Sequence, residues 1–255
     1  MYEINIDKII SEIIAFINEQ LKKAGFTRII VGLSGGIDSS VTAALCVKAL
    51  GKENVFGVML PYRKSHPDSL EHAKQVAEQL GIKYEVVDIS VMVDSYFKKY
   101  AAEADVLRKG NRIARERMCV LYDLSAKYKA LVAGTGNRSE IMVGYCTQYG
   151  DNACAFEPIG HLYKTEVLEL AKILDLPDFV INKEPSADLW EDQTDEKEMG
   201  ITYSKLDEIL YQMLDLKSGK EEMIKQGFSK QETEKVEKMI RNSEFKRNMP
   251  PITRK

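Results

Sequence analysis

Apolar positions along this chain follow two alternating patterns. Isoleucines recur at three- and four-residue spacings from Ile6 to Ile17, which marks one face of a helix, and Gly25 ends that predicted helix. Beyond it, short apolar runs with strand character alternate with longer amphipathic stretches. The runs predict strands over 28–33, 55–60, 83–89 and 130–135, and the stretches predict helices over 39–50, 68–80, 91–102 and 104–128.

This alternation predicts an α/β fold. Apolar strands separated by helices pair side by side in a parallel sheet, and the helices then cover both of its faces. We therefore expect a Rossmann-like parallel sheet flanked by helices. The last third of the chain is highly charged and mostly helical in pattern, with no strong repeat and no linker-like composition. It predicts a helical C-terminal extension of one domain that spans residues 1–255.

Composition and charge remove several classes of function. A hydrophobic content of 44% and a charged content of 29% are ordinary for a globular protein, and the net charge of −3 gives no global basic field for nucleic acid. The first residues carry acids, unlike a signal peptide, and no apolar run approaches the roughly 20 residues that span a bilayer. The four cysteines form no C-x-x-C pair, which argues against structural zinc or disulfides. These features predict a cytoplasmic protein with free thiols and without nucleic-acid or membrane partners.

The most informative segment is a glycine- and serine-rich loop after the first predicted strand. It reads Gly32-Leu33-Ser34-Gly35-Gly36-Ile37-Asp38-Ser39-Ser40. Adjacent glycines let backbone N–H groups turn toward an anion, and the following helix directs its positive end to the same place. A Walker loop would end in a lysine and a hydroxyl residue, and this loop has no lysine. Its place after a strand puts it at the carboxyl edge of the sheet, where open α/β folds bind ligands.

Asp38 adds a carboxylate to this anion-binding loop. Alone it would repel phosphate, so a bridging Mg²⁺ is the expected resolution. The alternative is that Asp38 or Ser39 only caps the helix. Capping accounts for one residue and leaves the two glycines and three serines unexplained.

The loop resembles the S-G-G-x-D-S signature of the ATP pyrophosphatases, which split ATP into AMP and pyrophosphate and have a Rossmann-like fold of the adenine-nucleotide α-hydrolase type. The resemblance implies that residues 32–40 bind ATP and hold the departing pyrophosphate. GMP synthetase, asparagine synthetase, argininosuccinate synthetase and tRNA-thiolating enzymes share the signature. The loop therefore indicates the chemistry and leaves the substrate open.

Later segments resemble the NAD synthetase family. The first, similar to the family's N-x-x-A-R-x-R-M, reads Asn111-Arg112-Ile113-Ala114-Arg115-Glu116-Arg117-Met118. On a helix, Arg108, Arg112 and Arg115 form one stripe. Arg117 lies on the apolar face, which predicts a buried, paired and structural side chain. The resemblance makes Arg115 a substrate contact, and a solvated charge run remains the alternative for Arg108 and Arg112.

Two further segments resemble the family's nucleotide and ammonia sites. In Gly134-Thr135-Gly136-Asn137-Arg138-Ser139-Glu140, the resemblance makes Thr135 an ATP contact and Glu140 a Mg²⁺ ligand beside Asp38. A plain helix-start acid is the alternative for Glu140. The other segment reads Gly144-Tyr145-Cys146-Thr147-Gln148-Tyr149-Gly150-Asp151 and is followed by Pro158 and Lys164-Thr165-Glu166. Here the resemblance puts Asp151 near the ammonia and nicotinate end, and Lys164 at the reacting phosphate of ATP.

Two segments near the end complete the resemblance. Pro185-Ser186-Ala187-Asp188-Leu189-Trp190, followed by Gln193-Thr194-Asp195-Glu196, is close to a family motif in which Ser186 meets ATP, and its aperiodic polar character predicts a mobile loop. Phe245-Lys246-Arg247 resembles the family's H-K-R, which makes Lys246 a substrate contact, with a disordered basic tail as the alternative. The chain has Gln148, Ala155 and Phe245 where lysine, aspartate and histidine are common in relatives. Gln148 is still expected at the substrate.

The resemblance covers roughly residues 29–251 and implies an ammonia-dependent NAD synthetase reaction. The pyridine carboxylate of deamido-NAD (nicotinic acid adenine dinucleotide) attacks the α-phosphate of ATP and expels pyrophosphate, and ammonia then displaces AMP from the acyl-adenylate. Asp38, Asp151 and Lys164 would be catalytic, Mg²⁺ the cofactor, and the family's homodimer the assembly. Only about 28 residues precede the strand before the phosphate loop, which leaves no room for the amidase domain of glutamine-using relatives. Free ammonia is therefore the expected donor, with supply by a separate amidase partner as the alternative.

Two alternatives remain open at this point. One is another ATP pyrophosphatase, either an amidotransferase synthetase or a tRNA-thiolating enzyme. A thiolating enzyme would be expected to have paired cysteines or an appended RNA-binding domain, and the sequence indicates neither. The other is a nucleotide-binding module without turnover. Such a module could lose its metal carboxylates, whereas Asp38 and Glu140 are both present.

Overall fold

Four parallel strands form the sheet of the computed structural model, which describes residues 5–190 and 192–253. The strand order is β3-β2-β1-β4, so that β1 pairs with β2 on one side and with β4 on the other. The strands are β1(Ile29–Gly32), β2(Val55–Met59), β3(Lys83–Val86) and β4(Leu131–Ala133). The parallel sheet predicted from the alternating pattern is confirmed.

The strands are shorter than their apolar runs predict, most clearly at β3. It ends at Val86, three residues before the predicted end at Ile89. The chain beyond it leaves the regular ladder, although Val87 still donates to Met59 O and Ile89 to Pro61 O. Ile89 is fully buried. The apolar pattern therefore predicted burial at Ile89 correctly, although the strand itself ends earlier.

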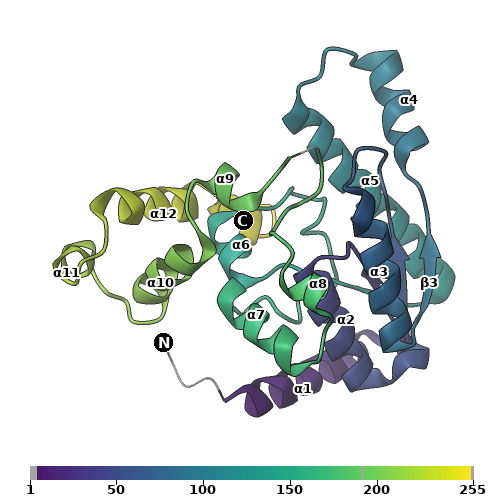
Figure 1. Cartoon of the computed structure of the whole chain (residues 1–255), viewed down its shortest axis with the longest axis horizontal. Coiled ribbons are helices and arrows are strands. Elements are labelled where there is room, and N and C mark those ends of the chain that lie inside the picture. The colour runs from purple at the N-terminus through teal and green to yellow at the C-terminus, as the bar shows by residue number, and fades with distance from the viewer. Residues whose placement is uncertain (1–4, 191, 254–255) are drawn as a thin grey trace.

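Helices cover both faces of the sheet (Figure 1). Side chains alternate along β1, so Ile29 and Val31 enter one hydrophobic cluster and Ile30 enters the other. The first cluster is closed by α1(Ile6–Ala24), α2(Ile37–Leu50), α3(Pro67–Leu80), α7(Lys164–Ile173) and α8(Asp178–Ile181), and the second by α4(Ser90–Tyr100) and α5(Val106–Tyr128). This is the predicted sheet with helices on either side.

Helix boundaries follow the predicted turn chemistry. α1 ends at Gly25 and α3 at Gly81, both in the left-handed conformation that glycine adopts without strain. α2 begins at Ile37, two residues earlier than predicted, because Gly36 already occupies the N-cap. The short 3-10 helix η1(Lys52–Asn54) connects α2 to β2.

The C-terminal third forms a helical unit with its own apolar core. Figure 1 shows α10, α11 and α12 on the side of the molecule opposite β3. The unit contains α9(Asp195–Met199), α10(Tyr203–Leu214), α11(Lys220–Lys225), α12(Lys230–Asn242) and the 3-10 helix η2(Glu244–Arg247), and it packs against α6(Arg138–Val143). The predicted helical extension is thus present. No helix in the described part of the chain is long and apolar enough to cross a bilayer.

A glycine ties this helical unit to the sheet domain. α6 ends at Gly144 with φ +72°, and a Cβ added there would lie 2.1 Å from Ser243 Cβ. Gly25 has the same role at the end of α1, with φ +74°, and a Cβ there would meet nothing within 4 Å. Substitution at Gly25 therefore tests backbone strain alone, whereas substitution at Gly144 tests backbone strain together with the close approach of Ser243.

We predict that Gly144→Ala destabilises the protein more than Gly25→Ala. Both variants suffer the strain of an L-residue in the left-handed region, about 1–2 kcal/mol. Only Gly144→Ala also forces α6 and the end of α12 apart, which adds about 1–3 kcal/mol. Denaturant unfolding of the two variants measures the difference, and equal losses would contradict the close packing at Gly144.

Candidate active site

A cavity of about 750 Å³ opens at the carboxyl edge of the sheet. Its wall comes from the loop after β1, the ends of β2 and β4, the start of α7, one face of α5 and residues within 183–190 and 193–198. The volume lies in the range of small-molecule sites in proteins. The predicted ligand edge of the sheet is therefore hollow.

The glycine loop is shaped by its neighbours and by its own hydroxyls. Gly35 has φ +71°, and a Cβ there would lie 2.4 Å from the Ser69 carbonyl oxygen in the first turn of α3. Ser39 and Ser40 both donate their hydroxyls to Gly36 O, at 3.0 and 2.8 Å. Of the predicted residues 32–40, six line the cavity, namely Gly32, Leu33, Ser34, Gly36, Ile37 and Asp38.

Asp38 does not act as the cap of α2. The N-cap is Gly36, and no side chain caps the helix. Instead Asp38 lies at the cavity, where its Oδ1 accepts a hydrogen bond of 2.9 Å from the side-chain amide of Asn137. The capping alternative for Asp38 and Ser39 is therefore not supported by the geometry.

Lys164 lies between two carboxylates. Its Nζ is 2.5 Å from Asp38 Oδ2 and 3.4 Å from Glu140 Oε1, and only 9% of its side chain is exposed. Burial alone would lower the pKa of Lys164, but Asp38 and Glu140 outweigh it, so the pKa is raised. For Glu140, burial raises the pKa, Lys164 lowers it, Asp38 and Asp195 raise it again, and the balance is about 8. The three predicted residues thus form one charged group.

Asn137 organises the segment that follows β4. It is fully buried, and its side-chain oxygen accepts the Glu140 N–H at 3.0 Å while its amide donates to Asp38. In return, the backbone N–H of Asn137 donates to Glu140 Oε2, which completes the capping box at the start of α6. Glu140 is therefore both a helix-start acid and a member of the charged group. The two interpretations of Glu140 coexist.

Helix α10 supports the charged group from behind. The Tyr203 hydroxyl lies within 3.1 Å of carboxylate oxygens of both Glu140 and Asp195 and can donate its one proton to either, and Asp207, one turn further on, accepts from Thr165 N at 2.9 Å. Asp207 also accepts from the Ser139 hydroxyl, which in turn accepts the Lys164 N–H at 2.9 Å. Ser139 and Thr165 are the chain neighbours of Glu140 and Lys164. One buried carboxylate therefore fixes the backbone on which both side chains stand.

Asp151 lies at the far end of the same cavity. Its carboxylate accepts the Thr147 N–H at 2.8 Å, and the Thr147 hydroxyl donates to Asn111 at 2.9 Å. The side chain stays accessible from the cavity although protein crowds it on other sides, and this crowding raises its pKa. Lys246 reaches the same end, where its Nζ donates to Gly144 O at 2.7 Å and to Cys146 O at 2.6 Å.

The structure brings most predicted contacts together and, besides Gly35, Ser39 and Ser40 of the loop, leaves Arg115 and Gln148 outside the cavity lining. Thr135, Ser186 and Lys246 line the cavity with the charged group. The Arg115 guanidinium instead donates to the Gln148 carbonyl oxygen at 3.2 Å on the surface of α5. Arg112 is not simply solvated, because it pairs with Glu116 at 2.7 Å and lies over the Tyr96 ring.

Arg117 faces the cavity as well as supporting the fold. It donates to Leu60 O at 3.1 Å and to the Ser65 hydroxyl at 3.3 Å, and it is partly buried, less than the sequence predicts. Its hydrogen-bond partners are neutral oxygens, whereas the sequence led us to expect a structural pair away from the site. Burial lowers its pKa, and Asp188 and Asp151 raise it from a longer distance. Arg117 lines the cavity, which the apolar face of its helix did not reveal.

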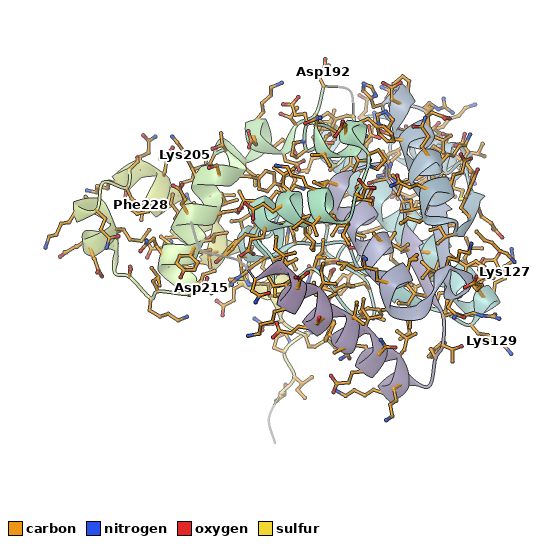
Figure 2. The ribbon with its side chains drawn as sticks, turned by 60° about the horizontal axis from the view of Figure 1, so that its bottom comes forward. Lys127, Lys129, Asp192, Lys205, Asp215 and Phe228 are labelled. Atoms are coloured by element: carbon orange, nitrogen blue, oxygen red, sulfur yellow. The ribbon has the colours of Figure 1, made fainter. Side chains whose placement is uncertain are left out.

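Residues 183–190 and 192–198 contribute one wall of the cavity and are held at several points. The His66 N–H donates to Asp188 Oδ1 at 2.7 Å, and the Trp190 ring lies so close to Gly110 that a Cβ there would be 2.8 Å from it. At the other end, the Tyr145 hydroxyl donates to Asp195 at 3.0 Å. Asp192 points away from the body of the molecule (Figure 2). The predicted mobility of this segment stays a prediction.

Several functional side chains were not singled out by the sequence. Asn137 stands directly before a helix, where an N-cap is expected, so a signal was present. Tyr203 and Asp207 lie in a charged helical stretch without a motif, and only the tertiary fold brings them to the site. Glu157 is a further case. It lies behind the segment after β4, where its Oε2 accepts the Gly136 N–H at 3.0 Å, and burial raises its pKa to about 7.

Comparison with known proteins gives a consistent result. A sequence model described as NAD synthase matches residues 9–250. The NH(3)-dependent NAD(+) synthetase of Fusobacterium nucleatum is 48% identical over 99% of this chain and 97% of its own length. The enzyme of the same name from Trichlorobacter lovleyi is 46% identical over 95% of this chain and 88% of its own length.

Solved structures agree with the sequence relatives. The NH3-dependent NAD synthetase of Campylobacter jejuni, in complex with the nitrate ion, superposes with a TM-score of 0.84 at 35% identity and covers 98% of this chain and all of its own. The NMN synthetase of Francisella tularensis superposes with a TM-score of 0.87 at 30% identity, over 98% of this chain and 99% of its own.

We predict that Glu157→Gln removes a loss of stability that the wild-type protein shows as pH rises. Because the pKa of Glu157 in the folded protein, about 7, lies above the ordinary value of 4.5, its contribution to stability is present below pH 4.5 and is lost as pH rises through 7. The loss amounts to about 3 kcal/mol. Denaturant unfolding from pH 4.5 to 7.5 measures it, and identical pH dependence in both proteins would contradict the buried carboxyl.

Proposed function

The chain belongs to the NAD synthase family, and from that premise we propose how its own residues make NAD. The protein is a ligase that forms a C–N bond with ammonia and uses ATP as co-substrate. The observation that carries the residue assignments is the meeting of Asp38, Glu140 and Lys164 at the phosphate loop. We further propose that residues 1–255 act as one catalytic unit in the cytoplasm.

Asp38 and Glu140 are the residues that would hold Mg²⁺. Carboxylate oxygens are the ligands that Mg²⁺ prefers, and the two share the cavity with the phosphate loop. When both carboxylates are ionised, Asp38 and Glu140 together carry one more negative charge than Lys164 compensates. A divalent cation fits that excess. When bound, Mg²⁺ supplies charge neutralisation to the triphosphate of ATP.

Activation takes place at the α-phosphate of ATP. The pyridine carboxylate is anionic and has no good leaving group, so one of its oxygens attacks the α-phosphorus and pyrophosphate leaves. Lys164 is placed to stabilise the negative charge on the α-phosphate oxygens during this displacement. Thr135 and Ser186 hold the nucleotide from the end of β4 and from residues 183–198. The backbone N–H groups of the loop receive the pyrophosphate.

Amide formation takes place at the Asp151 end of the cavity. Ammonia is mostly ammonium at neutral pH, so a carboxylate is needed to bind it and accept a proton. The raised pKa of Asp151, caused first by burial, brings that carboxylate closer to the range of a proton acceptor. The free ammonia then attacks the acyl carbon, and the C–O bond to AMP breaks. The released AMP keeps the carboxylate oxygen.

The remaining substrate contacts are proposed for Arg115, Gln148 and Lys246. Lys246 is in the cavity, whereas Arg115 and Gln148 lie together on the surface of α5. The neighbouring surface exposes large apolar side chains, with Val106 61% and Leu107 63% accessible. We propose that a second copy of the chain covers this surface in a homodimer.

Pyrophosphate release tests the function directly. We expect release that depends on deamido-NAD and ammonia together with ATP. The corresponding mononucleotide acid is the comparison acceptor, because one structural neighbour is named an NMN synthetase. If pyrophosphate is released with the mononucleotide acid and not with deamido-NAD, the protein makes NMN instead of NAD. If it is released only with another acceptor, ATP cleavage at the α-phosphate stands and deamido-NAD is not the substrate.

We predict that Asp151→Asn raises the KM for ammonia and lowers kcat by 10²- to 10⁴-fold, as expected for the loss of a proton acceptor. Pyrophosphate release in the first turnover should be preserved, because adenylation does not use this carboxylate. Rapid-quench measurement of pyrophosphate separates the two steps. An unchanged rate and an unchanged dependence on ammonia would remove Asp151 from the mechanism.

We predict a molar mass of about twice 28.9 kDa in solution. Val106→Glu should shift the protein toward the monomer, because a charge would be buried in the contact, and Val106 does not line the cavity. Light scattering on the purified proteins measures both masses. A monomeric wild-type protein would contradict the proposed dimer and would leave the residues proposed inside the cavity unchanged.

A further inference from the structure

The phosphate loop lacks its own lysine, and the departing pyrophosphate carries several negative charges. The loop offers neutral backbone N–H groups and hydroxyls, two of which are already donated to Gly36 O. The charge of Lys164 is engaged by Asp38 and Glu140. A further cation beside the loop would therefore change how strongly pyrophosphate is held.

Lys183 is a cation of the cavity wall that no part of the proposed mechanism uses. It follows α8 and lines the cavity, and its Nζ donates to the Ser69 hydroxyl at 2.9 Å. Within residues 5–190 and 192–253, no carboxylate oxygen lies at ion-pair distance from this ammonium group. Burial lowers its pKa, while Asp188 and Asp68 raise it from a longer distance. Its charge is thus only partly compensated.

Ser69 connects Lys183 to the phosphate loop. It stands in the first turn of α3, and its carbonyl oxygen lies 2.4 Å from the place of a Cβ on Gly35. The loop backbone and the first turn of α3 are therefore in direct contact at Gly35. The Lys183 ammonium group is bonded to the side chain of the same serine. Lys183 thus approaches the loop at Gly35, whereas Lys164 approaches it at Asp38.

We propose that Lys183 binds the pyrophosphate that leaves ATP and so supplies, from a distant part of the chain, the lysine that the loop lacks. This inference rests on the proposed function, in which the loop receives pyrophosphate. It divides the work between two lysines. Lys164 acts at the α-phosphate, where bonds change, and Lys183 acts on the leaving group. Because a hydrogen bond between two charged partners is among the stronger polar contacts, its loss is measurable as affinity.

Binding of inorganic pyrophosphate with Mg²⁺ to the intact protein, followed by isothermal titration calorimetry, tests the inference without turnover. We expect Lys183→Met to weaken pyrophosphate binding about ten- to a hundredfold. Lys183→Arg keeps the charge and should recover most of the affinity. Lys172→Met, an exposed lysine on α7, is the matched control and should bind as the wild type does. AMP affinity should be unchanged in all of them.

Two outcomes would overturn the inference. Pyrophosphate binding by Lys183→Met within twofold of wild type would remove the contact. A parallel loss of AMP affinity would instead make Lys183 a tether between residues 183–198 and α3. Failure of the proposed function is recognised separately, because the wild-type protein would then show no pyrophosphate release dependent on deamido-NAD and ammonia.

Discussion

The ion pairs of Lys164 with Asp38 and Glu140 are the constraint on which the rest of the site depends. They join the start of α7 to the phosphate loop and to α6, three segments far apart in the sequence. Removing one member of such a buried group leaves charge without a partner, at a cost of about 3–5 kcal/mol. The arrangement is therefore tolerated only where the surrounding backbone is fixed. It also concentrates charge beside the phosphate loop, where we propose that the triphosphate of ATP and Mg²⁺ bind.

The fixing is done largely by the C-terminal helical unit. Tyr203 and Asp207 stand one turn apart on α10, and between them they contact Glu140 and the backbone neighbours of both Glu140 and Lys164. At the end of α10, Asp215 repeats the bridge by accepting from Arg138 and Tyr163, the residues that begin α6 and cap α7. The extension that looks accessory in Figure 1 is thus the support of the charged group. This explains why a chain with a small sheet devotes so much length to helices beyond it.

The fold was largely predictable, and the site only in part. Strand–helix alternation and the glycines at helix ends reflect the preferences of the local backbone. The parallel sheet and most helices could therefore be predicted, with small errors at their ends. Asp38, Glu140 and Lys164 were predictable because they stand in motifs beside strand and helix ends. Tyr203, Asp207 and Lys183 have no such local signal, since their roles arise from packing between distant elements. Arg117 does have a local signal, but an ambiguous one. An apolar helix face predicts burial and does not distinguish a hydrophobic core from the wall of a cavity.

The central claim is that the carboxylate of the acceptor is joined to the α-phosphate of ATP at the Asp38, Glu140 and Lys164 group. Transfer of oxygen isotope tests it most directly. Deamido-NAD labelled with ¹⁸O in the pyridine carboxylate is converted with ATP and ammonia, and the phosphorus products are examined by mass spectrometry. The account predicts one ¹⁸O atom in the phosphate of AMP and none in pyrophosphate. Unlabelled AMP, or label in a product released from the β- or γ-phosphate, would contradict it.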